Sequence, residues 1–252
     1  MKYYFIKNKI NFLFLFISFF YLILIIGVDN ISFQSTGWLH AGNDRTLPQL
    51  GWHFFKNDIW RFPLGSNPNY GDELGSSIIF ADTIPILALI FKMFRSLIPD
   101  NFQYISLWYF ICFYLQLFFS FKIIKKFTNS VLYSLIGSFF FLITPIFMWK
   151  LAMIPALAGQ WTLLIALYLG LSKKIDQAKW PWFFLIILSS LINFYFMIMI
   201  IAAYSLLRIF NFRFDKINII KFIKDFIFIT TFLLLILYVV GYFQVRMADT
   251  MA

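Results

Sequence analysis

The sequence predicts an all-α, polytopic membrane protein: a helical bundle of about seven or eight membrane segments with one large polar loop on the outer face. Three observations predict this class. The composition is 62% hydrophobic and only 13% charged, unlike that of a soluble domain. Several apolar stretches reach the about 20 residues that a helix needs to cross a ~30 Å hydrocarbon layer. Basic residues gather beside these stretches, whereas acidic residues gather in one segment.

The basic residues predict the orientation of the chain. Of the 21 Lys and Arg residues, 14 lie in four clusters next to apolar stretches, as is typical of cytoplasmic loops. The clusters are Lys2/Lys7/Lys9, Lys122/Lys125/Lys126, Lys173/Lys174/Lys179 and Arg208/Arg213/Lys216/Lys221/Lys224. We therefore predict a multi-pass protein of the cell inner membrane with a cytoplasmic N-terminus. This pattern accounts for the net charge of +10 without nucleic acid, so membrane lipids are the expected partners and the oligomeric state stays open.

We predict that the whole chain, residues 1–252, forms a single membrane domain. Residues 1–9 are predicted to be a cytoplasmic tail and residues 10–28 the first transmembrane helix. This apolar run is longer than a signal-peptide core and no small-residue cleavage site follows it, so it should stay as an anchor. Residues 29–79 form the extracytoplasmic loop, and residues 80–252 contain the remaining transmembrane helices.

The later apolar stretches differ in quality. Clean candidates cover residues 102–121, 131–149, 151–171, 180–207 and 226–243. The stretch 180–207 is too long for one helix and has basic residues at both ends. We therefore predict two short helices that meet outside, near Asn193.

The stretch 78–97 is a poor span, because Asp82, Pro85, Lys92 and Arg95 interrupt it. Two alternatives remain for its path. In the first, it touches or re-enters the membrane without crossing, which leaves the Lys122 cluster inside. Otherwise it crosses once, and the Lys122 cluster lies outside.

The outer loop concentrates the chemistry of the chain, because six of its eleven acidic residues lie between Asp29 and Asp82. The segment TLPQLGWHFFKNDIW (46–60) has one broad apolar side and predicts a helix in the membrane surface. The following segment, RFPLGSNPNYGDELGSS, is rich in Pro, Gly and Asn, which favour tight turns. We expect Ser76 and Ser77 to cap a helix that begins at Ile78.

A resemblance to a known class appears at this point. One span, a large outer loop with an early acidic residue and an interfacial helix, and then many spans resemble the GT-C class of membrane glycosyltransferases. The motifs GWHFF, WRFPLG, NPNYG, SSI and DTIP, within residues 42–92, resemble the loop of an uncharacterised bacterial GT-C-like family. This stretch covers about a fifth of the chain. Members of the class have more spans, so we expect this chain to be an N-terminal portion.

The resemblance implies transfer of a sugar from a polyprenyl-phosphate donor to an acceptor on the outer face of the cell envelope. Asp44 matches the early loop acid and is the candidate general base. Substrate-binding candidates are Arg45, Arg61, Trp52, Asn69 and Tyr70, with the two arginines expected on lipid phosphate. Asp82 is a candidate to hold a divalent metal ion, the one cofactor we consider, or to orient a loop side chain.

Two other functions remain open. A transporter or flippase for a lipid-linked precursor would also need a folded outer loop. It is disfavoured because the apolar spans carry almost no ionisable residues, which coupled transporters usually need near mid-bilayer. A non-catalytic membrane assembly partner is the third alternative.

Overall fold

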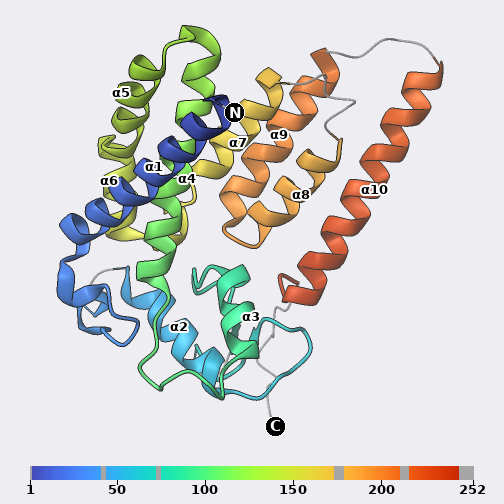
Figure 1. The fold of residues 1–252 in the computed structure, drawn as a ribbon. Coiled ribbons are helices and arrows are strands. Elements are labelled where there is room, and N and C mark those ends of the chain that lie inside the picture. Colours follow the sequence, from blue (N-terminus) through green and yellow to red (C-terminus); the bar gives the residue numbers. More distant parts are fainter. Residues whose placement is uncertain (1, 41–43, 72–74, 173–178, 211–215, 244–252) are drawn as a thin grey trace. The chain divides into compact units, whose positions relative to one another are not determined.

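The computed structural model describes residues 2–40, 44–71, 75–172, 179–210 and 216–243, which form helices and one small two-stranded sheet (Figure 1). The chain divides into two compact units. Unit 1 consists of Met1–Gln49 and Ile98–Tyr168, and unit 2 consists of Leu50–Leu97 and Leu169–Ala252.

Unit 1 is entirely helical in its regular elements. They are α1 (Lys2–Ile26), η1 (Val28–Asn30), η2 (Gly37–Leu39), α4 (Ile105–Thr128), α5 (Val131–Leu142), α6 (Pro145–Met153), η4 (Pro155–Ala158) and most of α7 (Trp161–Ser172). The predicted surface helix is confirmed as a helix, α2 (Thr46–Asn57), which begins in unit 1 and continues into unit 2.

Helices α1 and α4 run antiparallel to each other (Figure 1). The chain leaving α1 is bonded to the chain entering α4: the Gln103 amide donates to the Phe33 carbonyl at 2.7 Å, and the Ser106 hydroxyl donates to the Ile31 carbonyl at 3.3 Å. Toward the other end of the pair, the rings of Phe14 and Phe121 meet at 5.4 Å. The Lys122 cluster therefore lies at the same end as the N-terminus of α1.

This arrangement bears on the two alternative paths of residues 78–97. If α1 and α4 both cross a membrane, the end of α1 and the start of α4 lie at the same face. The segment between them must then return to that face. The one helix within residues 78–97, α3 (Pro85–Met93), has nine residues. Such a helix is about 14 Å long and cannot cross. The alternative without a crossing agrees with both observations.

Unit 2 joins loop residues to the last three helices, α8 (Lys179–Ser190), α9 (Phe194–Phe210) and α10 (Lys216–Val240). The break between α8 and α9 confirms the predicted division of the long apolar stretch near Asn193. The two helices form a hairpin, because the rings of Trp182 and Tyr204 meet at 5.6 Å near its open end.

The loop is attached to the turn of this hairpin and to the end of α10. The amide of Leu64 donates to the Val239 carbonyl at 2.7 Å, and the Ser77 hydroxyl donates to the Val240 carbonyl at 3.3 Å. The amide of Ile86 donates to the Leu191 carbonyl at 2.9 Å. These bonds satisfy carbonyls at helix ends that have no partner within their own helix.

Gly65 permits this attachment. A Cβ at position 65 would lie 2.1 Å from the Val240 carbonyl oxygen and 3.0 Å from the Cγ1 atom of Ile78. We expect Gly65→Ala to lower the free energy of unfolding by about 1–3 kcal/mol, because a backbone atom must move. Gly37→Ala is the matched control, since a Cβ there meets nothing within 4 Å. Denaturant titration of both variants in detergent micelles measures the difference, and equal stabilities would refute the close contact.

The helix expected to start at Ile78 starts at Pro85 instead, so that prediction is wrong. Ser76–Ser77 (β2) pairs as a short antiparallel strand with Ser66–Asn67 (β1). Asp82 and Ile84 then have positive φ angles of 51° and 54°, which no right-handed helix tolerates. Pro85 occupies the start of α3, where its missing N–H costs nothing. The cap position is Ile84, and no side chain caps the helix.

The all-α class is confirmed, whereas the predicted seven or eight membrane segments are not. Within the described ranges, three helices are long and apolar enough to cross a membrane: residues Asn8–Ile26 of α1, helix α4, and residues Phe222–Val240 of α10. A fourth span results if α5 and α6, bent by 40° at their break, count as one. Helices α7 and α8 have 12 residues each, about 18 Å. The apolar stretches of the sequence are long enough to cross a membrane, but turns divide them into shorter helices.

Candidate functional site

Asp44, the candidate base, lies in the turn that precedes α2 in unit 1. Its side chain is exposed, and its carbonyl accepts a hydrogen bond from the Leu47 amide at 3.3 Å. The carboxylate makes no hydrogen bond to any residue that the structure describes. Asp44 therefore presents its carboxylate to the surroundings and not to the protein.

Arg45 fixes this turn against α6. Its Nε atom donates to the carbonyl of Ala152 in the last turn of that helix. The neighbouring carbonyl of Leu151 would normally accept from residue 155, but Pro155 has no N–H. The Tyr109 hydroxyl replaces that donor at 2.6 Å. Arg45, predicted to bind phosphate, thus has a positioning contact that holds Asp44 beside the end of α6.

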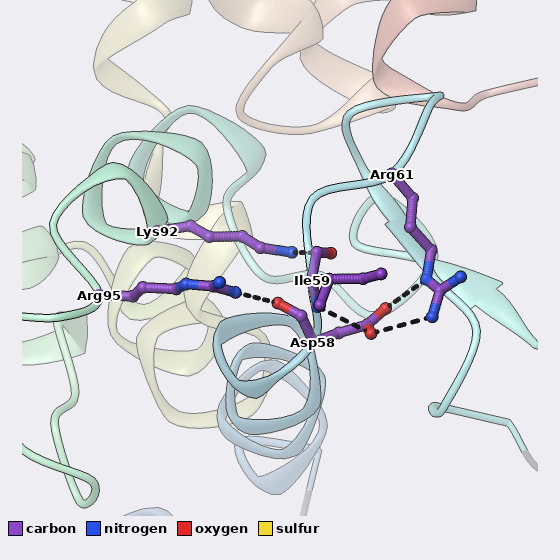
Figure 2. A network of polar contacts seen from close by, with 5 residues as sticks. All are labelled: Asp58, Ile59, Arg61, Lys92 and Arg95. Atoms are coloured by element: carbon purple, nitrogen blue, oxygen red, sulfur yellow. Dashed lines mark hydrogen bonds and ion pairs between the residues drawn. The ribbon is translucent and has the colours of Figure 1, made fainter.

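A second group of charged residues surrounds Asp58 in unit 2 (Figure 2). The Asp58 carboxylate, buried in the protein, accepts from Arg61 Nε at 3.0 Å and from the Ile59 amide at 2.8 Å. Arg95 donates to the Asp58 carbonyl, and Lys92 Nζ donates to the Ile59 carbonyl at 3.2 Å. Burial raises the pKa of Asp58, but the hydrogen bonds from Arg61 and Ile59 outweigh it and lower the pKa overall. Arg61, the second predicted phosphate ligand, is thus paired with a carboxylate.

Lys92 is the most deeply buried cation of this group, with 1% of its surface exposed. Its Nζ lies 3.7 Å from the centroid of the Phe55 ring and 4.9 Å from that of Trp60. Such contacts stabilise an ammonium group by attraction to the ring faces. Burial nevertheless dominates and lowers the pKa of Lys92 to about 8.

This lowered pKa predicts a pH dependence of stability. Between about pH 8 and pH 10 the unfolded chain holds the Lys92 proton and the folded chain does not, so the free energy of unfolding should rise with pH. The Lys92→Met variant, which lacks the titrating group, should show a flatter profile. Denaturant titration in micelles from pH 7 to pH 10 measures both, with Lys150→Met as the lysine control. Parallel profiles of the wild type and Lys92→Met would contradict the prediction.

Asp82 lies at a third place, in unit 2, where α3 begins near the turn of the α8–α9 hairpin. Its Oδ1 accepts a hydrogen bond from Asn193 Nδ2 at 3.2 Å, and the Asn193 Oδ1 accepts from the Tyr195 amide at 3.0 Å. A pocket of about 460 Å³ is lined by Ile79, Phe80, Asp82, Pro85, Ile192, Asn193, Phe194, Tyr195 and Tyr242. The left-handed backbone of Asp82 and of the β-branched Ile84 is strained, and strain of this kind is frequent at functional sites.

Burial and the negative charge of Asp82 raise the pKa of nearby tyrosines. Burial raises the pKa of Tyr70, and the negative charge of Asp82 raises it further. The same two causes raise the pKa of Tyr242, whose hydroxyl donates to the Ser190 carbonyl at 3.3 Å. Both phenols are therefore hydrogen-bond donors at neutral pH and not bases.

The remaining predicted substrate ligands differ in exposure. Trp52 is 1% exposed and packs inside unit 2, so it is a core residue of the loop. Asn69 is exposed in the NPNYG turn, and Tyr70 is half-buried with its ring 6.0 Å from that of Phe54. The structure thus brings Tyr70 and Asp82 together in unit 2, whereas Asp44 and Arg45 belong to unit 1.

One protein family matches the chain over residues 15–252, and its description is Domain of unknown function (DUF6311). The chain belongs to this family. The match includes the polar loop and parts of both units. No curated protein and no solved structure matches the chain.

The described residues of this DUF6311 member do not form a metal site by themselves. Among the described residues, no group of three or more His, Cys, Asp or Glu side chains could hold a metal ion. Asp82 is the one carboxylate that lines its pocket, and Asn193 already donates to it. Of the two roles expected for Asp82, metal binding or orienting a loop side chain, the contacts favour the second, with Asn193 of the α8–α9 turn as the side chain.

Sequence reasoning missed several residues of these sites in the DUF6311 chain. Asn193 was recognised as a helix break but not as a partner of Asp82, which lies 111 positions earlier. Tyr242 lies at the end of the last apolar stretch and carried no signal of its own. Lys92 and Arg95 were treated as interruptions of a span, although basic residues inside an apolar stretch often have a buried partner.

Proposed function

We propose that this chain is a GT-C-like integral membrane glycosyltransferase, or the N-terminal part of one. It transfers a sugar from a polyprenyl-phosphate donor at the outer face of the inner membrane, with the N-terminus in the cytoplasm. The proposal rests on the likeness of residues 42–92 to the GT-C-like loop and on three or four helices able to span a membrane.

The position of Asp44 is the observation that carries the proposal. Its carboxylate is exposed at the end of unit 1 that is opposite to the Lys122 cluster, and Arg45 anchors the turn to α6. A general base must reach the hydroxyl whose proton it takes. An anchored turn with an exposed carboxylate meets that requirement.

The reaction uses Asp44 in one step. The acceptor hydroxyl oxygen attacks the anomeric carbon of the donor sugar, its proton passes to the Asp44 carboxylate, and the bond from the anomeric carbon to the phosphate oxygen breaks. Polyprenyl phosphate leaves with the bonding electron pair. Arg61 and Asp82 have no step in this scheme, because both are engaged by other side chains.

Transfer can be tested directly with the purified full chain in nanodiscs. The donors are short-chain polyprenyl phosphates carrying one radiolabelled hexose or pentose each, and the acceptor is an extract of cell-envelope glycans and lipids. We expect label to pass from one donor into the extract. Absence of transfer from every donor would refute the enzyme proposal, and movement of the donor across vesicles without transfer would support a flippase instead.

A further inference from the structure

The lysine-rich end of unit 1 contains a pocket that the proposed reaction does not use. It has a volume of about 450 Å³ and lies between the N-terminal part of α1, the last turns of α4 and α7. Its lining residues are Ile10, Asn11, Phe14, Phe118, Phe121, Lys122, Lys125, Lys126, Asn129, Val131 and Tyr168. The volume is within the range of small-molecule sites.

The charge of the lining is entirely positive. Lys122, Lys125 and Lys126 follow the i, i+3, i+4 spacing that brings side chains to one face of a helix. No Asp or Glu among the described residues lines the pocket. Three ammonium groups on one wall therefore favour an anion.

Aromatic rings hold two of these lysines at the pocket. Lys122 Nζ lies 4.1 Å from the centroid of the Phe118 ring and 5.4 Å from that of Tyr168. Lys126 Nζ lies 5.2 Å from the same Tyr168 ring. Lys125 Nζ donates to the Asn129 carbonyl at 2.6 Å, beyond the end of α4. The charges are thereby restricted to the pocket side of α4.

The rest of the lining is apolar. Ile10, Phe14, Phe121 and Val131 form a wall that a phosphate ion alone would not contact favourably. The pocket also lies at the ends of α1 and α4, two of the three helices able to span a membrane. Lysines at such helix ends extend to the depth of lipid headgroups.

We infer that this pocket binds an anionic phospholipid of the surrounding leaflet. The lysines contact the headgroup phosphate, and the apolar wall contacts the glycerol and the first part of the acyl chains. This site is independent of the proposed sugar transfer, because it lies at the opposite end of unit 1 from Asp44.

The experiment measures binding to the purified full chain in an uncharged detergent by native mass spectrometry. The probes are dioctanoyl phosphatidylglycerol, dioctanoyl phosphatidylcholine and glycerol phosphate. We expect saturable binding of the first probe and at least ten-fold weaker binding of the other two. If phosphatidylcholine bound as tightly as phosphatidylglycerol, the proposed role of the lysines would be wrong. If glycerol phosphate bound as tightly, the proposed contact with the acyl chains would be wrong.

Two kinds of variant separate a site from general attraction to a basic surface. Lys122→Gln should weaken phosphatidylglycerol binding roughly five-fold, whereas Lys150→Gln, a lysine of the same unit outside the pocket, should not. Asn11→Trp fills the pocket without changing the charge and should abolish binding. Leu13→Trp, two residues away and outside the lining, is its control. Wild-type affinity in both Lys122→Gln and Asn11→Trp would overturn the inference, and either variant alone suffices if the other does not fold.

Discussion

The Asp44→Asn variant should transfer sugar about 100- to 10,000-fold more slowly than the wild type, which is the usual contribution of a general base. Asparagine keeps the size of the side chain but cannot take the proton of the acceptor hydroxyl. Because Asp44 is exposed and its carboxylate contacts no described residue, folding should not change. The measurement is the initial rate of label transfer at saturating donor.

Asp29→Asn is the matched control for this variant. Asp29 is also exposed, belongs to the same unit and lies in the same loop. The Asp29→Asn variant should retain the wild-type rate if Asp44→Asn acts by removing the general base and not merely by removing a negative charge. An Asp44→Asn rate equal to that of the wild type or of Asp29→Asn would remove Asp44 from the mechanism.

The second large effect is expected at Asp225, at the end of unit 2 that is opposite to the loop. Its carboxylate pairs with Lys179 and, at 3.4 Å, with Arg208 Nη2. The Asp225 and Arg208 side chains are each 8% exposed. Asp225→Asn should lower the free energy of unfolding by about 3–5 kcal/mol, because it removes the charge of a buried carboxylate that pairs with a buried guanidinium.

A double variant distinguishes this cause from a general loss of packing. Adding Arg208→Met to Asp225→Asn removes the buried guanidinium as well, so the double variant should be more stable than Asp225→Asn alone. Denaturant titration in micelles measures both. A stability of Asp225→Asn within about 0.5 kcal/mol of the wild type would contradict a buried ion network.

Local sequence signals predicted the helices well. The apolar periodicity of residues 46–60 gave α2, and Asn193 between two basic ends gave the α8–α9 break. The predicted number of spans is not confirmed, because hydropathy measures apolar length and does not detect a turn inside an apolar run. The turns before Pro145 and at residues 191–193 divide stretches that are apolar throughout.

The partners of the charged side chains could not be predicted from composition. Arg45 and Arg61 were assigned to phosphate because guanidinium favours it, but one binds the Ala152 carbonyl and the other the Asp58 carboxylate. Asp225 was overlooked because a single acid at the edge of a basic cluster gives no pattern. Its function depends on Lys179 and Arg208, which only the fold brings to it.

The proposed orientation places the loop of residues 29–79 outside and the Lys122 and Arg208 clusters in the cytoplasm. Cys112, the only native cysteine, is fully buried, so new cysteines at exposed positions can be labelled selectively on intact cells. In unit 1, Gln34→Cys should react with an impermeant maleimide, and Thr128→Cys should react only after permeabilisation. In unit 2, Asn69→Cys should react on intact cells, and Phe210→Cys should react only after permeabilisation. Labelling of Thr128→Cys or Phe210→Cys on intact cells, or protection of Gln34→Cys, would contradict the account.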